Sequence, residues 1–132
     1  MKVLIKKVDW YLSEEIKEGT VTFQIGNHDY HAFSILDDYP VGEQVEVEFD
    51  HLSLTHDPWN NTFDKNPQKK KCLINTKDWS YDGYGRIISV NPIRADFGDI
   101  VLDLGKWSHD KRLIGEYIYW PISELSVSRN KE

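Results

Sequence analysis

The sequence has little cysteine, no long apolar run and less positive than negative charge, and each shortage excludes a class of protein. A single cysteine, Cys72, cannot form an internal disulfide, which excludes a disulfide-stapled scaffold. No apolar run approaches the roughly 20 residues of a membrane-spanning helix. Residues 1–7 also lack the apolar core of a signal peptide. We therefore expect a cytoplasmic protein with no membrane association.

The charge balance argues against a general affinity for nucleic acid. Acidic residues number 22 and basic residues 16, which makes the net charge −6 at pH 7. Binding to a phosphate backbone requires Lys and Arg gathered on one face. The one local exception is the basic run at Lys69, Lys70 and Lys71. The content of 39% hydrophobic and 29% charged residues favours a packed core over disorder.

Two pairs of segments resemble each other along the chain. KVLIKKVDW at 2–10 and KCLINTKDW at 71–79 share Lys, Leu, Ile, Asp and Trp at the same spacing. GEQVEVEFDHLSL at 42–54 and GEYIYWPISELSV at 115–127 share Gly, Glu, Leu and Ser without a gap. Shared strand composition explains an apolar alternation, but it does not explain a shared Asp-Trp pair. The sequence therefore indicates an internal duplication.

Two shorter matches lie between these blocks in the same order, GTVTF with GRIIS and DYHAFSIL with DFGDIVLD. We predict a first β unit at 1–54, a connecting loop at 55–70 and a second β unit at 71–132. A unit of this size buries little apolar surface alone. The two units are therefore expected to form one compact domain with a shared core.

The pattern within each unit is that of β-strands. Val45, Val47 and Phe49 alternate with polar residues, which is typical of a half-buried strand. The order of GTVTFQI, DYHAFSIL and VGEQVEVEF resembles that of oligonucleotide-binding and SH3-like small barrels, a resemblance that concerns the fold alone. We expect an all-β barrel or sandwich with little helix. It should contain about eight short antiparallel strands, at 2–10, 20–26, 29–36, 43–50, 71–79, 85–91, 97–104 and 113–120.

Four aromatic residues are candidates for a partner-binding surface. Tyr117 and Tyr119 occupy the outward face of the last predicted strand, where the first unit has Glu and Gln. A solvated face does not need tyrosines, so we expect them to contact either the other unit or a partner. Trp59 and Phe63 lie in the connecting loop, and a plain linker does not need large apolar side chains. We expect these two residues to dock on the barrel.

No pattern of catalytic residues stands out. Histidine is followed by aspartate at His28, His56 and His109, but these dipeptides occupy unrelated places in the two units. No spacing matches a metal motif, a phosphate-binding glycine loop or a nucleophile elbow. We therefore expect no catalytic residue, no metal and no cofactor.

Three hypotheses for the function follow. The first is a non-catalytic module that binds another protein or itself, for example an acidic protein that neutralises a basic partner. The alternative is a small barrel that binds single-stranded nucleic acid, which needs aromatic platforms and a basic groove. The third is a small enzyme that uses a metal or His and Asp between the two units. The basic residues available to the second hypothesis are Lys69, Lys70, Lys71, Arg86 and Arg94.

Overall fold

Two β-sheets make up most of the protein in the computed structural model. The structure describes residues 1–11, 15–53 and 59–130, without the side chains of 59–61. One sheet is a closed barrel and the other is a curled open sheet. Within the described residues, helix is limited to α1 (Trp59–Asp64) and the 3-10 turn η1 (Lys111–Leu113). The all-β class with little helix is confirmed.

Five strands close the barrel. In chain order they are β1 (Lys2–Trp10), β2 (Glu18–Ile25), β3 (His28–Ile35), β4 (Gln44–Leu52) and β10 (Glu124–Arg129). Around the barrel they run β1-β2-β3-β10-β4, and β4 pairs back onto β1. All neighbours are antiparallel except β10 and β3, which run parallel. This order resembles that of oligonucleotide-binding barrels, a likeness of fold that carries no function.

The barrel strands follow the alternation that their sequences predict. Val21 and Phe23 of β2 point inward and are fully buried, and Val45 and Val47 of β4 are buried in the same way. The residues between them face outward because successive side chains of a strand point to opposite sides. The apolar face of each strand therefore fills the barrel interior.

The open sheet is built around one long strand. Its strands are β5 (Cys72–Lys77), β6 (Ser80–Ser89), β7 (Ile93–Asp96), β8 (Val101–Gly105) and β9 (Tyr117–Ile122). β6 pairs with β5, β7 and β9, and β7 pairs with β8. Phe97 fills the concave side against Gly83 and Gly85, where an added Cβ would lie 2.9 and 2.8 Å from its ring. The two glycines therefore allow the sheet to curl around this ring.

The strand pairing differs from the predicted alignment of the two units. β1 pairs with β4, whereas β9 pairs with β6 and not with β5. The equivalence of 2–10 with 71–79 therefore does not hold. The orders β4-β1-β2-β3 and β9-β6-β7-β8 do coincide when β6 takes the place of β1. A common origin of the two sheets stays a prediction.

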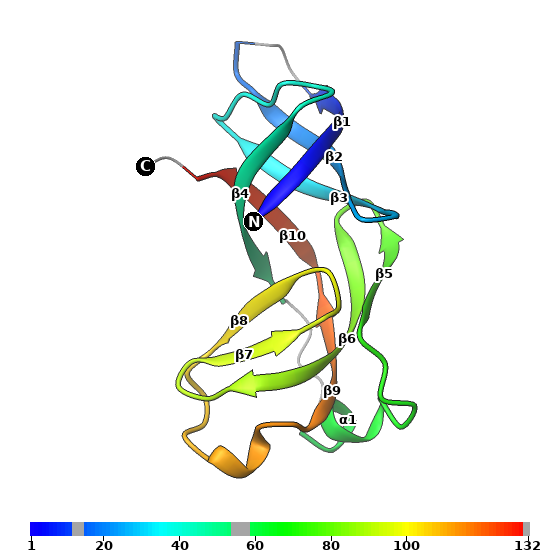
Figure 1. Ribbon diagram of the computed structural model, residues 1–132, viewed down its shortest axis with the longest axis vertical. Coiled ribbons are helices and arrows are strands. Elements are labelled where there is room, and N and C mark those ends of the chain that lie inside the picture. Colours follow the sequence, from blue (N-terminus) through cyan, green and yellow to red (C-terminus); the bar gives the residue numbers. More distant parts are fainter. Residues whose placement is uncertain (12–14, 54–58, 131–132) are drawn as a thin grey trace.

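The last strand returns to the first sheet. β10 lies in the predicted second unit by sequence, yet it closes the barrel between β3 and β4. Figure 1 shows it running up from the open sheet into the barrel. The predicted strand 97–104 begins too early, since Phe97–Ile100 form a turn before β8, and β7 lies outside the predicted strands. The described residues therefore contain ten strands, and one continuous hydrophobic cluster extends through both sheets.

Trp79, in the turn between β5 and β6, joins the open sheet to the barrel. Figure 1 shows this hairpin reaching up beside β3. The Trp79 Nε1–H donates to Thr20 Oγ1 at 2.9 Å, and its ring lies 4.9 Å from that of Phe33. Close by, the Tyr81 hydroxyl donates to the His31 carbonyl at 2.9 Å and accepts from its N–H at 2.7 Å. The outer face of β2 and β3 is thus partly covered.

Replacing Trp79 should weaken the whole fold. We expect Trp79→Ala to lower the free energy of unfolding in urea by about 3 kcal/mol, because it leaves a cavity between the two sheets. Trp79→Phe should lose mainly the bond to Thr20, about 1 kcal/mol. Tyr11→Ala is the control, since Tyr11 also contacts Trp79 but is 56% exposed. Equal losses for Trp79→Ala and Tyr11→Ala would contradict this role.

Candidate binding surfaces

Three tyrosines gather on the outward side of the open sheet. Tyr84 of β6 lies opposite Tyr119 of β9, and their ring centroids are 5.4 Å apart. Tyr117 follows on β9 opposite Arg86. All three tyrosines are half-buried. We call Tyr84, Tyr117 and Tyr119, together with the two lysines described next, the tyrosine face.

Two lysines stand over the rings of this face. Lys65 Nζ lies 5.1 Å from the Tyr119 ring centroid, and Lys70 Nζ lies 5.3 Å from that of Tyr84. Such cation–π contacts contribute about 0.5–1 kcal/mol each at exposed sites. The Tyr119 hydroxyl donates to Asp82 Oδ1 at 2.7 Å, which fixes the ring orientation. The tyrosine face therefore presents two positioned ammonium groups over paired rings.

A buried asparagine holds the lysine segment in place. Asn66 is 4% exposed, and its amide Nδ2 donates to the carbonyls of Ile118 and Lys70 at 3.1 and 3.0 Å. Its Oδ1 accepts from the Lys70 N–H at 2.8 Å. α1, just before this segment, packs against β9. Residues 59–70 are thus a docked part of the open sheet and not a free linker.

The structure brings most of the sequence candidates onto one sheet. Tyr117 and Tyr119 lie on the tyrosine face, and Phe63 packs against the core. The side chain of Trp59 lies outside the described residues, as do His56 and Asp57. Lys70 and Arg86 reach the tyrosine face.

In the described part of the chain, the other basic residues proposed for nucleic-acid binding, Lys69, Lys71 and Arg94, make no cation–π contact with the three tyrosine rings. Lys71 Nζ pairs with Asp96 at 3.2 Å, and both Lys69 and Arg94 are exposed. Sequence reasoning missed Tyr84 and Lys65. The alternation of Tyr84 with the buried glycines of β6 is the signal that could have placed Tyr84 on the outward side. Nothing in the sequence pairs Lys65 with Tyr119.

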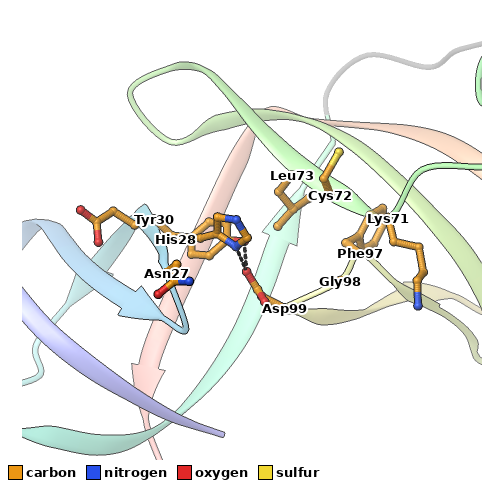
Figure 2. Close-up of a pocket in the computed structure, with 10 residues that line it drawn as sticks. Asn27, His28, Tyr30, Lys71, Cys72, Leu73, Phe97, Gly98 and Asp99 are labelled. Atoms are coloured by element: carbon orange, nitrogen blue, oxygen red, sulfur yellow. Dashed lines mark hydrogen bonds and ion pairs between the residues drawn. The ribbon is translucent and has the colours of Figure 1, made fainter.

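A pocket of about 330 Å³ lies where the β2–β3 turn meets the open sheet. Asp99 Oδ2 accepts from the Tyr30 hydroxyl at 2.6 Å and pairs with His28 Nδ1 at 2.7 Å (Figure 2). Burial, together with the bond to Asp99, raises the pKa of Tyr30 far above its usual value. Tyr30 therefore remains a neutral donor, and the Asp99 carboxylate ties the barrel to the open sheet.

This pocket does not assemble an evident nucleophile. Figure 2 shows Cys72 on the far wall, with its sulfur pointing away from His28 and Asp99. The adjacent His and Asp residues noted in the sequence do not act as pairs here. His28 pairs with Asp99 and not with its neighbour Asp29, and Asp110, which follows His109, accepts from the backbone N–H of Arg112 in η1. Among the described residues, no three His, Cys, Asp or Glu side chains are placed to hold a metal ion. In the same part of the chain, no helix is long and apolar enough to cross a bilayer.

His51 is a half-buried titratable group at the junction of the two sheets. The Trp120 Nε1–H donates to His51 Nε2 at 3.3 Å, so that nitrogen is an acceptor and the proton of the neutral ring sits on Nδ1. Nδ1 is buried and has no hydrogen-bond partner among the described residues. Burial lowers the pKa of His51, against a smaller opposing effect of Asp50 and Asp103. The folded protein therefore favours the neutral imidazole.

Known proteins do not supply a function for this arrangement. No protein-family model, no curated protein and no solved structure matches the chain. Any function must therefore be argued from these surfaces.

Protonation of His51 should make the fold sensitive to acid. With the pKa of His51 lowered in the fold, the unfolded chain binds the proton more readily as pH falls below about 6.5. The part of the folding stability that depends on a neutral His51 is fully present above that pH. It is lost as the pH falls toward the lowered pKa that His51 has in the folded protein. Urea denaturation between pH 7.5 and 5 should show a shallower pH dependence for His51→Gln. Identical dependences for the two proteins would contradict the role assigned to His51.

Proposed function

We propose that this protein is a non-catalytic module that binds another protein through the tyrosine face. The observation that carries the proposal is the paired Tyr84 and Tyr119 rings with a lysine ammonium over each. Tyrosine is favoured at protein interfaces because it buries a large area at a low cost in conformational entropy.

The placement of the rings supports an external contact. The inward residues of β9 are Ile118 and Ile122, which are fully buried, and Trp120, which packs against the same core. Tyr117 and Tyr119 alternate with them and lie on the opposite side of the sheet. Tyr119 is held by Asp82 of β6 and by Lys65 of the segment that follows α1.

The tyrosine face is also preorganised. The rings stand on paired strands, and Asn66 anchors the segment that carries Lys65 and Lys70. A surface that is already ordered loses less conformational freedom on binding, which leaves more of the contact energy as affinity.

Single-stranded nucleic acid is the alternative ligand for the same surface. Lys70 and Arg86 beside Tyr84 supply positive charge next to an aromatic ring, as such binding needs. However, a base could stack on Tyr84 or Tyr119 only by displacing the lysine that stands over the ring. The outer face of β2 and β3, which binds ligands in oligonucleotide-binding barrels, is partly covered by Trp79. These contacts favour a protein partner.

The test compares three immobilised forms of the protein in a lysate of the native host. They are the wild type, Tyr84→Ser/Tyr119→Ser, and Tyr11→Ser as a matched control on the barrel, where Tyr11 is 56% exposed. We expect a partner that the wild type and the control retain and the double variant loses. With the purified partner, the double variant should bind at least tenfold more weakly, about 1.4 kcal/mol, because it lacks both central rings.

Two further measurements separate the alternatives. Thermal unfolding of the double variant should stay close to that of the wild type, since a large drop would show that the rings are internal packing. A labelled oligo-dT bound by the wild type and lost by the double variant would favour nucleic acid instead. Sedimentation of the wild type alone tests whether the partner is a second copy. Equal retention of partners by all three forms would refute the proposal that the tyrosine face binds another protein.

A further inference from the structure

A second groove lies on the barrel, on a surface distinct from the tyrosine face. It occupies about 280 Å³ where β3, β10 and β4 run side by side. β10 pairs along its whole length with β4, but it meets β3 only at Ser126 opposite Phe33. The groove continues from this pair toward Ile35 of β3 and Ser128 of β10, on the closed barrel.

The walls of this groove carry three carboxylates and are therefore negatively charged. Glu48, Asp50 and Glu124 line it, and no Lys or Arg is among its lining residues in the described part of the chain. Among the described residues, Asp50 accepts the N–H of the adjacent His51, and Glu124 accepts from the Ser126 hydroxyl at 3.5 Å. These neutral donors leave the negative charge uncompensated. We call the site the acidic groove.

Apolar side chains lie beside these carboxylates. Phe33 lines the groove and Ile35 is 50% exposed beside it, although both are outward residues of a barrel strand. Leu52, opposite Glu124 on the neighbouring strand, is 49% exposed. The groove thus combines apolar contact area with negative charge, which a surface needing only solubility does not require.

We propose that the acidic groove binds an extended basic segment of another protein, in which Lys or Arg alternates with apolar residues. An extended chain points successive side chains to opposite sides, so its basic groups would meet Glu48, Asp50 and Glu124 while alternate side chains rest on Ile35 and Phe33. The net charge of −6 adds long-range attraction for such a partner. This proposal does not rest on the tyrosine face, whose lysines are of the opposite sign.

The test uses a fluorescein-labelled peptide of alternating Lys and Val, with binding measured by fluorescence anisotropy at low salt. Glu48→Gln/Asp50→Asn/Glu124→Gln should weaken binding at least tenfold. The matched control is Glu15→Gln/Glu43→Gln/Asp29→Asn, which removes the same charge at exposed positions outside the groove. It should change affinity less than twofold.

A second arm tests the apolar contact without changing the charge. Ile35→Ser should weaken the Lys–Val peptide severalfold and leave a Lys–Ser peptide unchanged. Circular dichroism checks that each variant is folded, and Glu48→Gln alone replaces the triple variant if that one unfolds. Equal losses in the groove and control variants would mean attraction by net charge only. That result, or an Ile35→Ser protein that binds like the wild type, would overturn the proposal.

Discussion

The structure depends on the return of β10 to the barrel. The first 52 residues supply four of the five barrel strands, and the fifth comes from residues 124–129 at the far end of the chain. Until β10 pairs with β4 and β3, the barrel has two open edges with unpaired backbone groups. The open sheet is therefore held at both ends by the same barrel. Its contacts through Trp79, Tyr81 and Asp99 complete one continuous core.

This connection also explains where binding surfaces are available. The open sheet partly covers the outer face of β2 and β3, so that face contributes to the internal junction. The two surfaces proposed for binding are the tyrosine face on the open sheet and the acidic groove on the barrel. They differ in sign because lysines of the 65–70 segment stand over the first, while carboxylates of β4 and β10 line the second.

Local patterns in the sequence predict local structure well. The alternation of Val45 and Val47 places them in the core, and the alternation of Tyr117 and Tyr119 places both on an outward face. β10 was missed although Leu125 and Val127 alternate with polar residues, because the match of 115–127 to 42–54 placed this segment beyond the end of the eighth predicted strand. The predicted strand 97–104 began too early because Phe97 turns into the curl of the sheet instead of continuing a strand, and β7 was missed.

The pairing of strands and the contacts between distant segments had no such pattern in the sequence. Strand alternation says which side a residue faces but not which strand lies beside it, so β5 was matched to β1 on the shared Asp-Trp pair. In the structure Asp78 lies in a turn with a φ of 49°, and Trp79 packs on the barrel. The pairs Lys65–Tyr119 and His28–Asp99 join distant segments in the same way. Only the folded arrangement reveals them.

The pairing of β10 in solution tests this account most directly. Nuclear Overhauser effects between backbone protons should connect Leu125 and Val127 with His51 and Phe49 of β4, and Ser126 with Phe33 of β3. That pattern is the result we predict for a barrel closed by the end of the chain. Backbone contacts of residues 124–129 with the open sheet alone, and none with β3 or β4, would contradict it.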